Sequence, residues 1–350
     1  MSKCTVIKAI AVDENGYISP VVSSSYWIGQ NNFLVDNVPV LSISTTYDNL
    51  FDPEYGIYCK GNAYLNWRNG PDYDPTYGSW QIPGNYINEG FDWERLSDLS
   101  YLDNTGALKC EQKVGLRIQG NGTRMLSKKS FNVFSRFTYD GNNKFSYRFN
   151  NKKCEAFSLK AGSTSNFMMT DVLNSKLAKK INLELGIQDF TGTYLYLNGE
   201  FWGYYFLADK FDSTFIEEKY GVKDSVIYKN GLVEEGHPTD INGFNTFGRN
   251  VSVTLNNQVL EDLENSTILN SLIDYNIFEY YLANDDWNYW NNCAMWKSKS
   301  KTAKSYEDGK LRMLLFDTDH TTLILHPIDC DSTTIVPYSA TYKILVELCG

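Results

Sequence analysis

The order of segments between residues 266 and 319 constrains the fold more than any other feature of this 350-residue chain. A helical pattern, TILNSLIDYNIFEYYLAN, follows Ser266, a residue type that caps helices, and gathers apolar side chains on one face. The pattern runs into NDDWNYWNNCAMW (284–296), whose last residues predict a short strand. A further strand at 311–316 ends at Asp317-Thr318-Asp319. Together with the strands described next, this order indicates the α+β class.

The earlier part of the chain predicts mainly antiparallel strands. Strands are expected at 38–45, in WERLSDLSYLD (93–103), and on both sides of a glycine-rich turn within 114–136. Asn198-Gly199 is the strongest short turn signal in the chain and predicts a hairpin. The stretch 62–90 is rich in Tyr, Gly and Pro, shows little periodicity, and therefore predicts a loop.

A helix is expected in NFMMTDVLNSKLAKKINLELG (166–186). Its apolar residues recur every fourth position and predict the face that packs on the core; they are Met169, Leu173, Leu177 and Ile181. Gly186 is expected to end this helix. A short helix at 212–221 and a strand at 225–229, which carries Lys229, follow.

The first 30 residues form a segment of their own in this interpretation. They alternate in polarity and turn at Asn15-Gly16, which predicts two strands. Because two strands do not fold stably alone, we expect 1–30 to be the end of a preceding β-sandwich module. The main domain is then 36–350, and the apolar ending KILVELCG predicts that it continues beyond this chain.

Composition excludes several classes of function. The formal net charge of −10 argues against nucleic acid and anionic membranes as partners, since both attract basic surfaces. No apolar run reaches the 18 or more residues of a membrane span. The seven cysteines are scattered without a CxxC pair, and the three histidines show neither metal-ligand spacing nor a neighbouring serine elbow.

Asp286 and Asn291, separated by four residues, are the first candidates for chemistry. In protein kinases an Asp with this spacing accepts the proton of the substrate hydroxyl, and the Asn binds Mg²⁺. A tight loop would return the Asn to the Asp, and Mg²⁺ prefers such oxygen ligands. The spacing is also frequent by chance, and an Asx turn capping the helix end is the ordinary alternative.

The strand end at Asp317 and Asp319 strengthens the kinase interpretation. In kinases a second Asp at a strand end binds magnesium at the phosphates. Two acids on either side of one residue repel each other unless a cation or a base neutralises them. We therefore predict that Asp317 binds metal, and Asp319 is either a second ligand or an acid of a surface loop.

Cations for the phosphates of a nucleotide are expected at the glycine-rich turn after residue 119. Arg124, Lys128 and Lys129 cluster there, and turn amides together with such side chains can bind anionic oxygens. A solvent-exposed hairpin is the alternative, since the stretch matches neither a Walker A loop nor GxGxxG. Lys229 is a further phosphate candidate, or a lysine that only reaches out to solvent.

A glycosidase is a competing interpretation of the same acids, because two carboxylates across a bond hydrolyse glycosides. Trp287, Trp290 and Trp296 would then stack on sugar rings. The asparagine pair Asn291-Asn292 and the basic turn have no function in such a site. Tryptophans that pack in the core or against loops are the ordinary alternative.

Several motifs in order resemble the CotH-type (spore-coat protein H) kinase family. They run from about Val38 to beyond Asp319, and are PVLSISTTYDNLFDPEYGIY, WERLSDLSYLD, LRIQGNGTRMLSKKSFNVFSR, YLYLNGEFWGYYFLADKFD, IYKNG, NDDWNYWNN and LLFDTD. Residues 1–30 are similar to the end of a chitobiase-C-terminal-type β-sandwich, which often precedes this domain.

The resemblance implies an atypical, two-lobed protein-kinase-like fold that binds ATP and Mg²⁺ and phosphorylates protein serine or threonine. By position, Asp286 matches the catalytic aspartate and Asp317 the magnesium-binding one. Asn291 and Asn292 match the paired asparagines, Lys229 a later lysine, and RMLSKKS the basic strand near the phosphates. The preceding module implies a secreted or cell-surface bacterial protein, with association with carbohydrate or cell wall through neighbouring modules, and the spore coat as the alternative.

Two departures from the family pattern bear on activity. A glycine expected shortly after the second acid is Leu323, and the frequent Glu-Lys after the hairpin is Asp209-Lys210. The competing class is therefore a non-catalytic surface module on a degenerate kinase-like fold, which binds glycans through its Trp and Tyr side chains.

Overall fold

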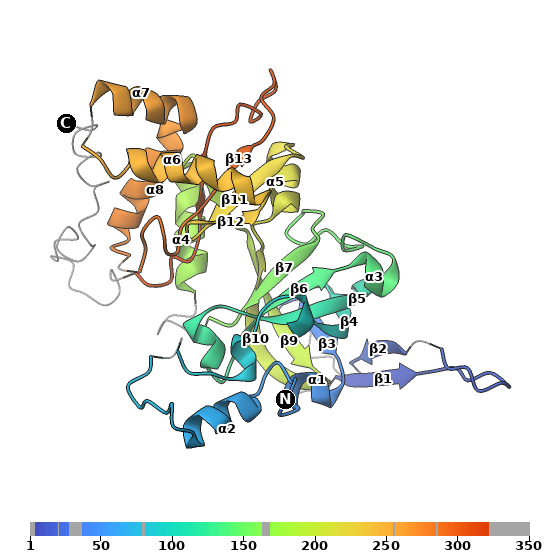
Figure 1. Cartoon of the computed structure of the whole chain (residues 1–350). Helices are drawn as coiled ribbons and strands as arrows, with labels where there is room; N and C mark the ends of the chain where they lie inside the picture. Colours follow the sequence, from blue (N-terminus) through green and yellow to red (C-terminus); the bar gives the residue numbers. More distant parts are fainter. Residues whose placement is uncertain are drawn as a thin grey trace. The chain divides into compact units, whose positions relative to one another are not determined.

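The computed structural model describes residues 4–19, 21–27, 37–78, 81–162, 169–254, 256–284 and 286–321. Contacts divide the chain into two compact units. The first unit comprises Met1–Ser163 and Phe190–Lys210, and the second comprises Thr164–Asp189 and Phe211–Gly350. Each contains both helices and strands, which confirms the α+β class (Figure 1). The kinase-like, two-lobed architecture stays a prediction.

The first unit is built on a closed barrel of seven strands. Its strand order is β10-β7-β6-β5-β4-β3-β9, in which β3 and β9 are parallel and the other neighbouring strands are antiparallel. The strands are β3 (Val40–Ser44), β4 (Arg95–Leu102), β5 (Leu108–Gln119), β6 (Ser130–Ser135), β7 (Ala156–Lys160), β9 (Phe190–Leu197) and β10 (Glu200–Asp209). Fully buried residues such as Leu41, Leu116 and Phe131 fill its core.

The strands predicted at 38–45, 93–103 and 114–136 are confirmed as β3, β4, and the β5–β6 pair. The hairpin at Asn198-Gly199 is also confirmed, since it joins β9 to β10. Both turn residues have positive φ, at 51° and 85°, which Asn and Gly tolerate better than other residues.

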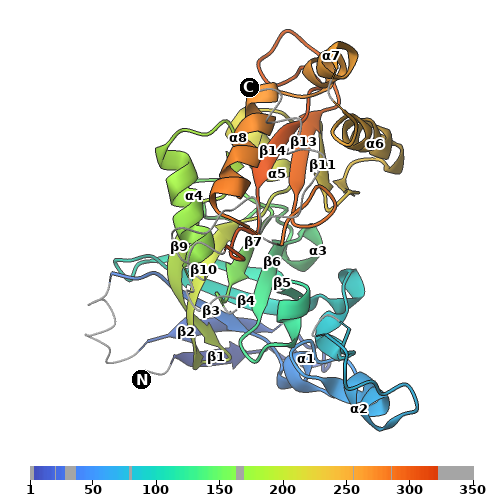
Figure 2. The ribbon, with the colours of Figure 1, turned by 90° about the vertical axis from the view of Figure 1, so that its left-hand side faces the viewer.

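The two strands predicted within 1–30 are present as β1 (Thr5–Ala9) and β2 (Val22–Tyr26), which pair with each other (Figure 2). The residues that precede these strands contact the barrel, because Cys4 donates its backbone N–H to Gly199 O at 3.1 Å and Lys113 Nζ donates to Val21 O at 2.8 Å. Their assignment to a preceding sandwich, and the boundary between 1–30 and 36–350, stay predictions.

A helix lies inside the stretch that the sequence predicts as a loop. The helix α2 (Gly61–Asn69) has no fully buried residue, so no periodic apolar face marks it in the sequence. The prediction of an irregular loop over 62–90 is therefore wrong in its first part. The other short helices of this unit are α1 (Tyr47–Phe51), α3 (Phe137–Asp140), η1 (Asn85–Ile87), η2 (Phe91–Trp93) and η3 (Gly122–Met125).

The second unit contains a five-stranded sheet with the order β12-β11-β13-β14-β8. Only the β14–β8 pair of this sheet is parallel. Its strands are β8 (Gly186–Ile187), β11 (Ser225–Lys229), β12 (Leu232–Glu235), β13 (Ala294–Ser298) and β14 (Arg312–Leu315). Its helices are α4 (Thr170–Lys180), α5 (Ser213–Tyr220), η4 (Pro238–Asp240), α6 (Ile241–Asn250), α7 (Asn257–Ser266) and α8 (Leu269–Tyr281).

The apolar face predicted for the helix α4 is wrong for three of its four residues. Met169, Leu173 and Ile181 are exposed, whereas Leu177 is partly buried and packs on the core. The buried side of the helix carries the polar residues Asn174 and Ser175 together with Val172 and Ala178. The helix also ends at Lys180, and Gly186 belongs to the strand β8. Hydrogen bonds of the polar face, described below, outweigh the pattern of apolar residues.

The start predicted for the long helix is also wrong. Ser266 is the last residue of α7 and α8 begins at Leu269, so Ser266 caps no helix start. Its hydroxyl instead donates to the carbonyl of Asp262 at 2.7 Å within α7. Throughout the described residues, no helix combines the length and the hydropathy that crossing a bilayer requires.

Candidate functional site

The loop that follows α8 is a tight turn anchored by buried aromatic rings. Asn288 and Asn291 pair through two backbone hydrogen bonds of 2.9 and 3.0 Å, which leaves Tyr289 and Trp290 at the tip. Tyr289 is buried and its hydroxyl donates to Asn276 Oδ1 of α8 at 3.1 Å. Trp290, with 54% of its surface exposed, lies beside Phe244 at 5.3 Å between ring centroids.

Two asparagine side chains hold Asp286 from both sides. Asn291 Nδ2 donates to Asp286 Oδ1 at 3.1 Å, and Asn292 Nδ2 donates to Asp286 Oδ2 at 3.1 Å. The same two amide nitrogens also donate to the backbone carbonyl of Asp286 at 3.0 and 2.9 Å. Both amide nitrogens are thus engaged with Asp286. The side-chain oxygens of Asn291 and Asn292 have no partner in the described part of the chain and can accept hydrogen bonds or bind a cation.

The end of β14 is fixed by the first turn of α4. Thr318 is buried, and both its backbone N–H (2.8 Å) and its hydroxyl (2.9 Å) donate to Asp171 Oδ1. Asn174 Nδ2 donates to Thr318 O at 2.8 Å. The preceding residue, Asp317, has φ = 57°, a left-handed conformation that is uncommon for a residue with a side chain. The hydrogen bonds of Thr318 with Asp171 and Asn174 therefore restrict the backbone next to Asp317.

Glu279 is a buried acid that the sequence analysis does not single out. Its side chain is 0% exposed, Oε2 accepts from Asn284 Nδ2 at 2.9 Å, and Oε1 has no hydrogen-bond partner in the structure as described. Burial raises the pKa of Glu279 to about 8, with smaller raising contributions from the charges of Asp171 and Asp317. A lone acid in the apolar run IFEYYL of a buried helix is the signal that would have marked it.

The acids near the end of β14 do not by themselves form a metal site. Within the ranges that the structure describes, no three His, Cys, Asp or Glu side chains are arranged to hold a metal ion. A Mg²⁺ ion bound here would therefore need the amide oxygens of Asn291 or Asn292 and oxygens of the substrate. Such mixed coordination is usual for Mg²⁺ in phosphoryl-transfer sites. The metal-binding roles of Asp317 and Asp319 stay predictions.

Arg124, in the first unit, makes contacts inside the protein. Its guanidinium donates to the carbonyls of Tyr86, Ile87 and Asn88 at 3.1 to 3.3 Å and to that of Gly120. It also pairs with Glu89 at 2.6 Å. These contacts hold the helical turns η1 and η3 together, and binding of phosphate by Arg124 stays a prediction.

Lys128 and Lys129 also point into the first unit. Lys128 Nζ donates to the carbonyls of Ala161 (2.9 Å) and Tyr204 (2.7 Å). Lys129 Nζ donates to the carbonyls of Arg124 and Leu126 and lies 4.4 Å from the centroid of the Tyr86 ring. Burial lowers the pKa of Lys129 to about 8. The alternative of a solvent-exposed hairpin is wrong for Arg124 and Lys129, which are buried.

Lys229 lies at the end of β11 in the second unit. Its Nζ is 4.3 Å from the centroid of the Phe316 ring, which directly precedes Asp317. Lys229 pairs in the sheet with Ala294, just after Asn292 and Cys293. The sheet therefore brings this lysine next to the asparagine loop.

The two departures from the family pattern have different outcomes. Asp209 forms an ion pair with Lys152 at 2.9 Å and accepts from Asn150 Nδ2 at 3.0 Å, so an acid after the hairpin still pairs with a lysine. Leu323 lies outside the described residues.

A search among curated proteins found no match to this chain. The family described as CotH kinase protein matches residues 116–341, which is more than half of the chain. That range contains the loop of Asp286, Asn291 and Asn292 and the strand end at Asp317. The chain belongs to the CotH kinase family.

Proposed function

We propose that this protein transfers the γ-phosphate of ATP to serine or threonine hydroxyls of a protein substrate, in a reaction that depends on Mg²⁺. The observation that carries the proposal is the pair of asparagine amides that hold both carboxylate oxygens of Asp286. Membership of the CotH kinase family supports the same reaction class.

Asp286 is the group that orients the substrate hydroxyl and accepts its proton. A carboxylate can do this only if it remains at hydrogen-bond distance from the hydroxyl while the phosphate is transferred. Four hydrogen bonds from Asn291 and Asn292 restrict both the side chain and the backbone of Asp286. Its exposed position leaves room for a substrate to approach.

Asp317 is the carboxylate assigned to the metal, with the free side-chain oxygen of Asn291 or Asn292 and with Asp319 as further candidates. One carboxylate, amide oxygens and phosphate oxygens suit the hard, octahedral Mg²⁺ ion. Bound Mg²⁺ would neutralise negative charge on the transferred phosphate. Lys229, beside Phe316 and the asparagine loop, is the cation assigned to the phosphates. Phosphate binding by Arg124, Lys128 and Lys129 stays a prediction from the sequence.

The test is incorporation of radiolabelled phosphate from ATP, with and without Mg²⁺. We expect incorporation by the wild type and loss of at least about a hundredfold in Asp286→Asn and Asp317→Ala. Glu261→Ala, which removes an exposed acid of α7, is the matched control and should keep full activity. Equal incorporation of phosphate by the wild type and by Asp317→Ala would contradict the assignment of Asp317 as a Mg²⁺ ligand.

A secreted or cell-surface location, with the spore coat as the alternative, is part of the proposal. It depends on the likeness of residues 1–30 to a module of secreted bacterial proteins. Fractionation of the producing cells, with an antibody against this chain, tests it. Recovery of the chain from the cytoplasm alone would contradict it.

A further inference from the structure

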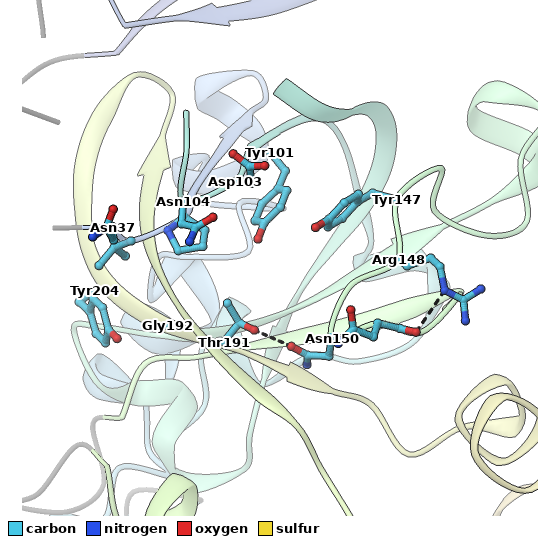
Figure 3. A pocket seen from close by; sticks show the side chains of 13 residues that line it. Asn37, Tyr101, Asp103, Asn104, Tyr147, Arg148, Asn150, Thr191, Gly192 and Tyr204 are labelled. Atoms are coloured by element: carbon cyan, nitrogen blue, oxygen red, sulfur yellow. Dashed lines mark hydrogen bonds between the residues drawn. The ribbon is translucent and has the colours of Figure 1, made fainter. Parts of the chain in front are cut away.

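The first unit contains a pocket that the proposed phosphoryl transfer does not use. Its volume is about 480 Å³, within the range of small-molecule sites. It lies where β3 begins, β4 ends and β9 begins, beside the loop 147–151 (Figure 3). Its principal side chains are those of Asn37, Tyr101, Asn104, Tyr147, Thr191 and Tyr204.

Tyr101 presents an unpartnered hydroxyl to this pocket. The residue is only 5% exposed, and its ring packs against Tyr147 and Phe149 at 5.3 and 5.0 Å between centroids. No hydrogen bond of its hydroxyl occurs in the described residues. Figure 3 shows the hydroxyls of Tyr101 and Tyr147 pointing toward the middle of the pocket. A hydroxyl that faces a pocket without a partner in the protein can bond to water or to a ligand there.

The charged side chains around the pocket are engaged or point away. Asp103 Oδ1 accepts from Thr105 and from the N–H of Ala107, and Oδ2 pairs with Lys109 at 3.1 Å. Arg148 Nε donates to Asn151 O at 3.1 Å, and its guanidinium points away from the pocket in Figure 3. The groups that a ligand can bind include hydroxyls and the amides of Asn37, Asn104 and Asn151, all of them neutral.

The walls of the pocket are held by contacts within the same unit. Asn150 accepts from the Thr191 hydroxyl at 2.7 Å and donates to Asp209 at 3.0 Å. Gly192 leaves room for the Tyr204 ring, since a Cβ at position 192 would lie 1.8 Å from the Tyr204 hydroxyl oxygen. The site therefore exists before a ligand binds, which reduces the entropy cost of binding.

We propose that this pocket binds an uncharged sugar, either a monosaccharide or the end of an oligosaccharide. Sugar hydroxyls both donate and accept hydrogen bonds, and tyrosine hydroxyls and asparagine amides complement them. The C–H face of a pyranose ring packs on tyrosine rings. An anionic ligand such as a nucleotide finds too few free cations here. The proposal is independent of the kinase activity, because none of its lining residues belongs to the assigned catalytic groups.

The test is saturation-transfer NMR and calorimetry with neutral sugars, using glucose, N-acetylglucosamine, cellobiose and chitobiose, and ATP in a separate arm. Tyr101→Phe removes only the unpartnered hydroxyl, so the fold should be unaffected and sugar affinity should fall about three- to tenfold. Asn104→Ala should lower it similarly. Tyr86→Phe is the matched control, because it removes an unpartnered buried hydroxyl elsewhere in the first unit.

We expect at least one sugar to bind the wild type and Tyr86→Phe equally and Tyr101→Phe more weakly. Absence of binding by all four sugars, or binding that is the same in Tyr101→Phe and the wild type, would overturn the proposal. A loss of ATP affinity in Tyr101→Phe without sugar binding would also overturn it, by identifying the pocket as a nucleotide site. Unchanged phosphate incorporation by Tyr101→Phe would keep the two proposals distinct.

Discussion

Asp171 in the first turn of α4 accepts two hydrogen bonds from Thr318, one from the backbone N–H and one from the hydroxyl, through a single carboxylate oxygen. Thr318 lies between the two acids at the end of β14, and so a helix more than a hundred residues earlier in the chain sets the conformation of this strand end. The side of α4 that carries Asn174 faces Thr318 and is buried, whereas Leu173 is exposed.

Asp171→Ala should destabilise the protein by about 2 kcal/mol, because hydrogen bonds to a charged group are lost and a buried threonine is left unpaired. Asp171→Asn keeps an acceptor oxygen and should recover about half of that loss. Thermal and urea unfolding measure both. Asp274→Ala, which removes one exposed bond to the N–H of Glu184, should cost less. Equal effects of all three substitutions would contradict this account of Thr318.

Glu279 should make the stability of the protein fall as pH rises. Its pKa is raised to about 8, above the value of an unfolded glutamate, so the folded state retains a proton that the unfolded state releases. The associated stability is fully present below about pH 4.5 and is lost as the pH rises to about 8, by about 1.4 kcal/mol per pH unit.

Glu279→Gln keeps the acceptor for Asn284 and removes this titration. Urea unfolding between pH 5 and 8 should therefore give a flatter profile for Glu279→Gln than for the wild type, and Glu261→Gln is the exposed control. Parallel profiles for Glu279→Gln and the wild type would show that Glu279 is ionised in the folded protein.

The asparagines that hold Asp286 should matter for rate more than for stability, since their contacts with it are exposed. Asn291→Ala frees one carboxylate oxygen and should lower the rate of phosphorylation at saturating ATP about tenfold to a hundredfold. Asn292 has φ = 50°, so Asn292→Gly removes the side chain without backbone strain, whereas Asn292→Ala adds strain. Unchanged rates in Asn291→Ala and Asn292→Gly would show that the hydrogen bonds from these asparagines to Asp286 have no function in the reaction.

Local signals in the sequence predict much of this fold. Asn198-Gly199 specifies its hairpin through positive φ at both residues, and the strand β6 shows the period-two burial that its sequence predicts. The Asp286–Asn292 loop was also predictable, because its partners lie within six residues of one another.

Contacts between distant residues explain what the sequence does not reveal. The buried face of α4 depends on Thr318, and the sequence offers no sign that these residues meet. Arg124 and Lys129 look like free cations because the carbonyls that they contact carry no residue-specific signal. Tyr101 is indistinguishable from other tyrosines until the loop 147–151 is placed beside it.

Glu94 is a buried acid of the first unit that connects β5 with the segment after β6. Its side chain is fully buried and accepts from Arg117 (2.8 Å), Arg136 (2.6 and 2.7 Å) and Tyr139 (2.8 Å). Burial alone would raise the pKa of Glu94, but these hydrogen bonds and the two arginine charges outweigh it and lower the pKa.

Glu94→Gln should therefore cost about 3 kcal/mol, since it leaves two partly buried arginines without their counter-charge. Because the pKa of Glu94 is lowered, its contribution is present above the pKa of an unfolded glutamate and is lost as pH falls through the lowered value. The wild type should therefore lose more of its free energy of unfolding at acid pH than Glu94→Gln does. An equal loss in both proteins would show that other carboxylates dominate acid unfolding.

Gly115→Ala tests the same contact sterically, because its Cβ would lie 2.0 Å from Glu94 Oε1. Chemical unfolding of both variants should show that the free energy of unfolding falls by more than about 2 kcal/mol. A fall below about 1 kcal/mol in Glu94→Gln would show that the contacts of Glu94 contribute no more than a surface salt bridge does.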